Sequence, residues 1–218
     1  MIYVCADIHG RYDLFMKLIN EIDLKKEDTL YVIGDIIDRG EESYAIYKYI
    51  INHDNIILLR GNHEQMMIDY VRRRYPDWFL NGGYKTLVSI PYSNNDELDQ
   101  YLHEMTTYFE GLPYYKRLEV NGKKYILVHA GIDYTLPMEK QKASTMLWIR
   151  EGFIDVDQRY EDSTIIFGHT PNRTMQFSGT SNDDMIFFEH KIAIDGAACF
   201  GGQINCLRLD DLKAYKIK

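Results

Sequence analysis

The chain has 218 residues, of which 45% are hydrophobic and 27% charged, as expected for a soluble globular protein with one substantial core. Its formal net charge of −8 argues against a general affinity for nucleic acid, because such binding needs a basic surface. No apolar run is long enough to span a membrane and no secretory signal is visible, so we expect a cytoplasmic protein without a membrane partner.

The three cysteines, Cys5, Cys199 and Cys206, include no CxxC pair, which argues against a disulfide framework or a thiolate zinc site. We expect them to be small core residues of a reduced protein. The one basic run, Arg72-Arg73-Arg74, is expected to be a solvated helix face.

The first sixty residues alternate strand-like and helix-like segments. Leu14, Leu18 and Ile22 recur at four-residue spacing, as the apolar face of an amphipathic helix does. We expect strands at 2–6, 29–33 and 55–59 and helices at 12–22 and 42–52. This repetition implies right-handed crossovers and a parallel sheet, in which ligands bind beyond the carboxyl ends of the strands.

The rest of the chain changes from a helical to a strand-like pattern. Residues 64–110 are mostly helical in pattern, and we expect a helical insertion beside or over the strand ends. Asn121-Gly122 is a strong signal for a tight hairpin. Further strands are expected at 116–120, 123–128, 164–167, 185–188, 191–194, 203–209 and 214–217. The chain is therefore predicted to be α/β, with two β-sheets packed in a sandwich flanked by helices, as a single domain over residues 1–218.

Five short polar clusters each follow one of these apolar strands. They are Asp7-Ile8-His9-Gly10, Gly34-Asp35-Ile36-Ile37-Asp38-Arg39-Gly40, Gly61-Asn62-His63-Glu64, His129-Ala130-Gly131 and Gly168-His169-Thr170. Taken singly, most have an ordinary explanation, since Asp7 or Asn62 could cap a helix and the pair Asp35 and Asp38 could close a turn and cap the next helix. A lone histidine at a strand end is usually a hydrogen-bonded core residue, but two of them, His129 and His169, are harder to dismiss.

Together the clusters supply six possible ligands for divalent metals. They are Asp7, His9, Asp35, Asn62, His129 and His169. One metal with an open position needs about three or four protein ligands, whereas six suit two metals about 3.5 to 4 Å apart that share one carboxylate. Because the set mixes oxygen and imidazole without thiolate, it favours manganese, iron or zinc over calcium or magnesium.

The series D-x-H-G, G-D-x-x-D-R-G, G-N-H-E, H-A-G and G-H-T is complete and in this order between residues 7 and 170. In this series the chain resembles the calcineurin-like metallophosphoesterases and, within them, the small bacterial and phage-type serine/threonine protein phosphatases of the phosphoprotein phosphatase family. Residues 194–196 followed by 200–202 are similar to the C-terminal segment of bacterial members. Asn81-Gly82-Gly83 with Thr86-Leu87 is also similar to bacterial relatives, although a plain turn explains it equally well.

The resemblance implies two metal sites that share one residue. Asp7 and His9 would bind one divalent metal, and Asp35 would bridge it to the other. The remaining ligands of the second metal would be Asn62, His129 and His169. A hydroxide that bridges the metals would be the nucleophile, and the metals would be Mn²⁺, with Fe or Zn as alternatives.

The resemblance also implies the residues that act on the substrate. His63 would be the general acid that protonates the leaving alkoxide, and Asp38 would orient it. Arg39 is similar to the family's first phosphate-binding arginine, and Asn62 would also face the phosphate. Arg150 lies where small bacterial and phage members carry their second arginine, with a plain surface position as the alternative.

The function implied is that of a metal-dependent phosphomonoesterase acting on phosphoserine and phosphothreonine in proteins or peptides, with phosphotyrosine as a further candidate. The first alternative is a symmetrical dinucleoside tetraphosphate hydrolase, which would place an anhydride across the same metals but tends to have a longer chain. A nucleic-acid phosphodiesterase is disfavoured by the net charge. A non-catalytic binding protein on the same fold is disfavoured because every expected ligand position is filled.

Overall fold

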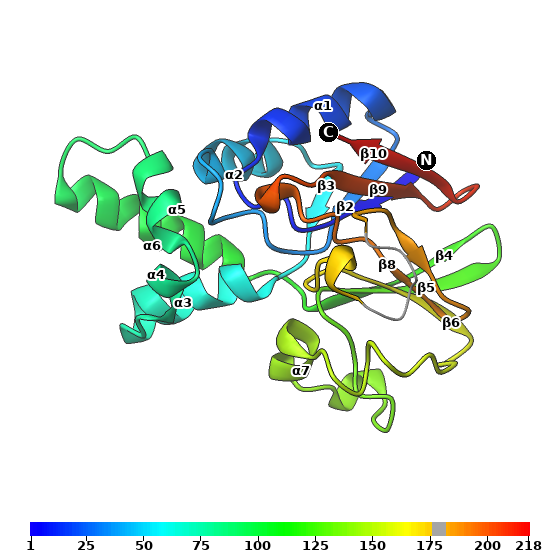
Figure 1. Ribbon diagram of the computed structural model, residues 1–218. Coiled ribbons are helices and arrows are strands. Elements are labelled where there is room, and N and C mark those ends of the chain that lie inside the picture. Colours follow the sequence, from blue (N-terminus) through cyan, green and yellow to red (C-terminus); the bar gives the residue numbers. More distant parts are fainter. Residues whose placement is uncertain (176–181) are drawn as a thin grey trace.

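The computed structural model describes residues 1–175 and 182–218, which form two five-stranded sheets with helices outside them (Figure 1). The first sheet has the strand order β10-β9-β1-β2-β3. Its parallel core consists of β1 (Ile2–Cys5), β2 (Thr29–Val32) and β3 (Ile56–Leu58). The other members are β9 (Ile204–Arg208), antiparallel to β1, and β10 (Lys213–Ile217), antiparallel to β9. The parallel order expected for the first sixty residues is confirmed, and the C-terminal strands make the sheet mixed.

The second sheet has the strand order β4-β5-β6-β8-β7. Its parallel strands are β5 (Lys123–Val128), β6 (Ser163–Phe167) and β8 (Lys191–Ala193). Its antiparallel edges are β4 (Tyr115–Val120) and β7 (Ile186–Phe187). The predicted β4–β5 hairpin turns at Asn121 and Gly122, whose φ angles of 50° and 76° are the positive values that a tight two-residue hairpin needs.

The helices cover the outer faces of the sheets and form an arm at one side. The first sheet is covered by α1 (Tyr12–Ile22) and α2 (Ser43–Ile51). The arm, at the left of Figure 1, consists of α3 (Asn62–Arg73), α4 (Asp77–Leu80), α5 (Gly83–Ser89) and α6 (Asn95–Glu110). These four helices match the helical pattern of residues 64–110, and the single-domain reading stays a prediction. The sequence pattern did not indicate α7 (Ala143–Trp148) or the short 3-10 turns Met138–Lys140, Asn172–Thr174 and Ala198–Phe200.

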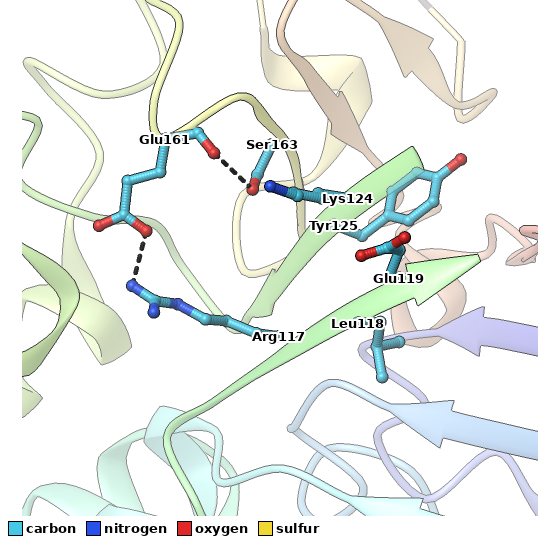
Figure 2. Close-up of a pocket in the computed structure, with 7 residues that line it drawn as sticks. All are labelled: Arg117, Leu118, Glu119, Lys124, Tyr125, Glu161 and Ser163. Carbon is cyan, nitrogen blue, oxygen red and sulfur yellow. Dashed lines mark hydrogen bonds and ion pairs between the residues drawn. The ribbon is translucent and has the colours of Figure 1, made fainter. Parts of the chain in front are cut away.

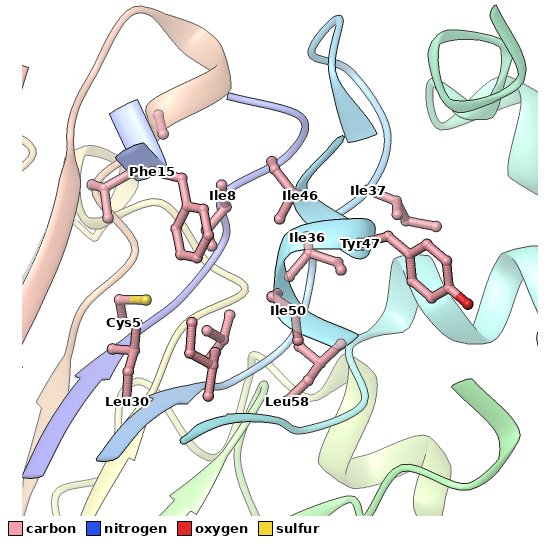
Figure 3. Close-up of a cluster of buried hydrophobic side chains, with 14 of the residues drawn as sticks. Cys5, Ile8, Phe15, Leu30, Ile36, Ile37, Ile46, Tyr47, Ile50 and Leu58 are labelled. Carbon is pink, nitrogen blue, oxygen red and sulfur yellow. The ribbon is translucent and has the colours of Figure 1, made fainter. Parts of the chain in front are cut away.

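Three clusters of buried apolar side chains hold these layers together. The first lies between the first sheet and its helices and includes Ile8, Phe15, Leu30, Ile46 and Leu58 (Figure 3). The second joins the two sheets through Val4, Ile33, Leu127, Ile166 and Ile194. The third lies between the second sheet and α7 and includes Ile126, Met146, Phe153 and Phe167. Because each fully buried aliphatic or aromatic side chain stabilises the fold by about 1.5–3 kcal/mol, this sandwich is a firm support for the loops at its strand ends.

Two smaller expectations have different outcomes. Cys5 and Cys206 are fully buried core residues, but Cys199 is only partly buried, so its assignment to the core is wrong; it lies in the turn Ala198–Phe200, which leaves the sheet. Arg72 is exposed at the end of α3, as expected for the basic run, and forms a 2.9 Å ion pair with Glu110 of α6. Within the described ranges, no helix has the length and apolar character needed to cross a membrane.

Candidate metal centre

The five polar clusters meet at one edge of the sandwich, beyond the carboxyl ends of β1, β2, β3, β5 and β6. Backbone hydrogen bonds join them in pairs. The amide of His9 donates to the carbonyl of Asp35 at 2.9 Å, and the amide of Gly168 donates to the carbonyl of His129 at 2.8 Å. The strand ends of both sheets therefore bring together residues that are up to 162 positions apart in the sequence. We call this cluster the candidate metal centre.

The backbone at the candidate metal centre is strained. The six predicted site residues with left-handed φ angles, between 45° and 72°, are Asp7, His9, Asp35, Asp38, Arg39 and His169. Such a conformation costs about 1–3 kcal/mol for a residue with a side chain, and it tends to accumulate at functional sites. Gly61 and Gly168 relieve the crowding, because a Cβ at either position would overlap the carboxylate of Asp35 or of Asp7.

Helix capping does not explain Asp7, Asp35, Asp38 or Asn62, although Glu64 completes a capping box at the start of α3. The N-cap of α1 is Arg11, that of α2 is Glu42 and that of α3 is Gly61. Asn62 is instead the first residue of α3. The alternative reading of Asp7, Asp38 or Asn62 as a helix cap is therefore wrong.

Asp35 lies at the centre of the cluster. Its Oδ2 is 3.5 Å from Nε2 of His9, and its Oδ1 is 3.5 Å from Nε2 of His129. In the described part of the chain, Asp35 is shared by two groups with the geometry to hold a metal, one with His9 and His63 and one with His129 and His169. Burial would raise the pKa of Asp35, but the surrounding imidazoles lower it below its usual range. A buried, ionised carboxylate between two sets of imidazoles is a suitable bridge between two cations.

The histidines are held in the neutral form that binds metals. Nδ1 of His9 lies 2.9 Å from the carbonyl oxygen of Ile37, and Nδ1 of His129 lies 2.9 Å from that of Ile33. Donation of Nδ1–H to these carbonyls directs the Nε2 lone pair into the centre. Burial lowers the pKa of both rings and that of His169, the last to about 2.

The donor atoms fit a divalent cation. A neutral histidine has one N–H, yet both nitrogens of His129 face oxygen acceptors, the second being Oδ1 of Asn62 at 2.8 Å. Nε2 of His169 is buried without a hydrogen-bond partner among the described residues. Such atoms are costly to bury unless something satisfies them, and a cation would satisfy both. The oxygen and imidazole donors, without thiolate, match manganese, iron or zinc.

Asp7 lies beside the two groups and belongs to neither of them. Both of its carboxylate oxygens accept from the backbone amide of His169 at 3.1 Å. Burial, with the nearby charges of Asp195 and Asp35, raises its pKa well above the usual range. The pairing of Asp7 with His9 at one metal stays a prediction.

His63 is buried between Asp38 and Asp35 in the centre. Its Nδ1 is 2.6 Å from Oδ2 of Asp38, and its Nε2 is 3.9 Å from Oδ2 of Asp35. Burial would lower the pKa of His63, but the charge of Asp35 and the hydrogen bond and charge of Asp38 raise it above the ordinary value. Among the imidazoles of the centre, His63 is therefore the one that most readily carries a second proton.

The two predicted phosphate arginines lie on different sides of the centre. Nη1 of Arg39 is 2.7 Å from Nε2 of His9, and its guanidinium lies over the ring of Phe200 at 5.3 Å. Arg150 is exposed, and its charge lowers the pKa of both His129 and His169. It lines a pocket of about 280 Å³ together with Thr170, the residue after His169.

Several residues of the centre were not assigned a role from the sequence. The buried carboxylate of Glu64 accepts from the amides of Asp35, Ile36 and Gly61 at 2.8–2.9 Å and so holds the turn that presents Asp35. In the sequence, only its position in the G-N-H-E motif could have indicated this supporting role. Asp195, within a segment noted only for its resemblance to bacterial members, lies close enough to Asp7 to raise its pKa. Trp78 and Thr86 from the helical arm contact Asp38.

A separate hollow of about 360 Å³ lies over β4, β5 and β6 (Figure 2). It includes none of the predicted site residues. Its charged side chains are paired in part, since Arg117 lies 2.6 Å from Glu161. This hollow is therefore not part of the candidate metal centre.

The chain is similar over most of its length to a known family and to named proteins. Residues 1–202 match the family described as calcineurin-like phosphoesterases. Serine/threonine-protein phosphatase 2 of Salmonella typhimurium is 30% identical over 178 residues, which cover 77% of this chain and 78% of the relative. Serine/threonine-protein phosphatase 1 of the same organism is 26% identical over 215 residues, covering 95% and 91%.

Other similar proteins are named for a different substrate. A symmetrical bis(5'-nucleosyl)-tetraphosphatase of Buchnera aphidicola is 22% identical over 281 positions, covering 98% of this chain and 96% of the relative. A crystal structure described as that of a proposed diadenosine tetraphosphatase has a TM-score of 0.74 and 17% identity, covering 99% of this chain and 92% of that one. The structural likeness confirms the expected fold class.

Proposed function

Because the chain belongs to the calcineurin-like phosphoesterase family, we propose that it is a protein serine/threonine phosphatase that uses two divalent metal ions. The observation that carries the two-metal proposal is the position of Asp35, whose two carboxylate oxygens each lie 3.5 Å from a histidine of a different group. Mn²⁺ is the metal we expect, with Fe or Zn as alternatives. The proposed ligands are Asp7, His9, Asp35, Asn62, His129 and His169.

In the proposed reaction, the chain's own side chains bind the phosphate and deliver a proton. Divalent ions at the centre would lower the pKa of an attacking water and draw charge from the phosphate oxygens. Arg39 and Arg150 would donate to the phosphate oxygens from different sides, because a guanidinium fits such oxygens with two parallel hydrogen bonds. His63, with Nδ1 held by Asp38, would give the proton on Nε2 to the leaving alkoxide.

Length argues against the symmetrical tetraphosphatase alternative. The alignment with serine/threonine-protein phosphatase 1 covers nearly the whole chain in 215 residues. The alignment with the symmetrical tetraphosphatase needs 281 positions for a chain of 218 residues, so that relative carries extra segments.

A substrate panel with defined metals tests this proposal. We expect Mn²⁺-loaded protein to hydrolyse phosphoserine and phosphothreonine peptides with a higher kcat/KM than diadenosine tetraphosphate. A higher kcat/KM on diadenosine tetraphosphate would instead support the tetraphosphatase alternative. The structural likeness to a proposed diadenosine tetraphosphatase is the reason for including this substrate. No hydrolysis of either peptide, of diadenosine tetraphosphate or of p-nitrophenyl phosphate with any divalent metal would leave only the non-catalytic alternative.

A further inference from the structure

The helical arm reaches into the candidate metal centre at Asp38. The indole Nε1–H of Trp78 lies 2.9 Å from each carboxylate oxygen of Asp38, and the hydroxyl of Thr86 donates to Oδ1 at 2.5 Å. We infer that Trp78 and Thr86 are positioning residues for the general acid, acting on His63 through Asp38. This inference rests on the proposed function, in which His63 protonates the leaving group.

The contacts determine how the Asp38 carboxylate can lie. Its Oδ1 accepts from the hydroxyl of Thr86, its Oδ2 lies 2.6 Å from Nδ1 of His63, and the indole N–H of Trp78 is shared between the two oxygens. The backbone amide of Asp38 donates to the hydroxyls of Ser43 and Thr86, both at 2.9 Å. Rotation of the carboxylate away from His63 would break at least two of these hydrogen bonds in a site with no exposure to water.

The orientation of His63 follows from that of Asp38. A carboxylate that accepts at Nδ1 holds the proton there and turns Nε2 toward the centre, where the leaving oxygen would be. Asp38 is 0% exposed and His63 1% exposed, so water cannot easily replace a lost donor. Loss of the indole or hydroxyl donor would therefore widen the range of orientations open to His63 without touching a metal ligand.

The arm is itself built to hold Trp78 in place. Trp78 is 0% exposed, its ring lies 5.2 Å from that of Tyr70, and a Cβ at Gly83 would overlap the indole. The same turn also contacts Arg39, the predicted phosphate-binding arginine, because the carbonyl of Gly82 accepts from the amide of Arg39 at 3.4 Å. The segment Asn81-Gly82-Gly83, which a plain turn could explain from sequence, thus packs against the residues next to the general acid pair.

The dependence on the leaving group separates positioning from general damage. An ester with a poor leaving group, phenyl phosphate, needs the proton from His63, whereas dinitrophenyl phosphate releases a stable anion without it. For Trp78→Phe, which keeps an aromatic ring but removes the N–H, we expect kcat on phenyl phosphate to fall by roughly tenfold, which is part of the roughly 10²–10⁴-fold that general-acid catalysis contributes. On dinitrophenyl phosphate we expect a change of less than about threefold.

Matched variants make the test independent of folding defects. Thr86→Val removes the hydroxyl at nearly constant shape and should repeat the selective loss, whereas Thr86→Ser should restore it. Phe79→Leu changes a ring neighbour of Trp78 that has no hydrogen bond to Asp38 among those of the described residues, and it should affect both esters equally or not at all. In a His63→Asn background, Trp78→Phe should cause no further loss on phenyl phosphate.

Equal losses on both esters, or losses that multiply with His63→Asn, would overturn the positioning role. If only one variant folds, the other and the double-mutant comparison still decide the question. Activity of the wild-type protein on phenyl phosphate tests the proposed function separately. A wild type that hydrolyses both esters, with variants that show no leaving-group dependence, would therefore contradict the inference and leave the phosphatase proposal standing.

Discussion

Nε2 of His129 lies 2.8 Å from Oδ1 of Asn62, while Nδ1 of the same ring faces the carbonyl oxygen of Ile33. A neutral His129 has one N–H, which can be donated to only one of these two oxygens. The burial that lowers the pKa of His129 also disfavours the doubly protonated ring, which would otherwise satisfy both oxygens. The protein alone thus leaves this contact unfavourable, and a cation at the same place would make it favourable.

We therefore predict that chelation inactivates the protein and that Mn²⁺ both restores activity and raises the midpoint of thermal unfolding. Binding to the folded state alone stabilises it in proportion to RT ln(1 + [L]/Kd), about 2.7 kcal/mol at a hundredfold excess over Kd. Calorimetric titration of chelated protein should show two ions per chain, and Asn62→Ala should weaken one of them. His103→Ala, an exposed histidine outside the centre, is the control. Failure of every divalent metal to restore activity would contradict the two-metal proposal.

The role of His63 can be separated from that of a metal ligand. Its Nε2 lies within 4 Å of Asp35, so it could in principle join His9 and Asp35 around an ion. As a general acid, His63→Asn should lower kcat on a phosphate monoester by roughly 10²–10⁴ while two ions still bind per chain. If His63→Asn lost one bound ion together with its activity, His63 would be a metal ligand instead. If the variant kept most of its activity, His63 would have no role in the mechanism.

The sequence predicts the layers of the fold well because its strands are short apolar runs bounded by polar clusters. It does not predict α7, because the six residues Ala143–Trp148 are too few to show a helical period. Nor does it show the antiparallel pairing of β9 with β1, which depends on how distant segments fold back on each other. Tertiary contacts of this kind leave no local pattern in the chain.

The candidate metal centre was predicted from motifs, and the structure adds the residues that hold those motifs in place. Glu64 lies within the G-N-H-E motif, but its buried hydrogen bond to the amide of Asp35 joins it to a strand end 29 residues earlier in the chain. Asp195 accepts locally from the amide of Ala197, and its closeness to Asp7 depends on how the two sheets pack. Trp78 belongs to none of the quoted motifs and contacts Asp38, which lies 40 residues earlier in the chain. A tryptophan in a helical segment most often packs in a core, and only its N–H contact identifies a further role.

The two arginines should differ in what they contribute to phosphate binding. Arg39 is half-buried beside His9, whereas Arg150 is exposed on the side of His129 and His169. Since a hydrogen bond to a charged group contributes about 1.5–3 kcal/mol, Arg39→Ala should weaken competitive inhibition by inorganic phosphate by roughly 10- to 100-fold. Arg150→Ala should weaken the inhibition by phosphate less than Arg39→Ala does, because solvent screens the charge of the exposed Arg150. Arg117→Ala, far from the centre, is the control; an unchanged inhibition constant in Arg39→Ala would remove it from the phosphate site.

The loop that carries Arg150 is anchored by a buried lysine with an unusual titration. The ammonium of Lys191 on β8 donates to the carbonyls of Phe153, Ile154 and Val156, and its side chain is fully buried. Burial lowers the pKa of Lys191 to about 8, against the opposing charges of Asp157 and Asp155.

The direction of the pH dependence follows from this shift. Between about pH 8 and the ordinary lysine pKa of about 10.4, the unfolded chain binds more protons than the folded one, so the free energy of unfolding should rise with pH. Relative to Lys191→Met, which cannot titrate, the wild type should gain up to about 1.4 kcal/mol per pH unit across this interval and show a constant difference below it. Urea unfolding of both proteins at several pH values measures this difference. If the wild-type advantage shrinks with rising pH, the folded protein prefers the charged lysine, and the carbonyl contacts outweigh the cost of burying the ammonium.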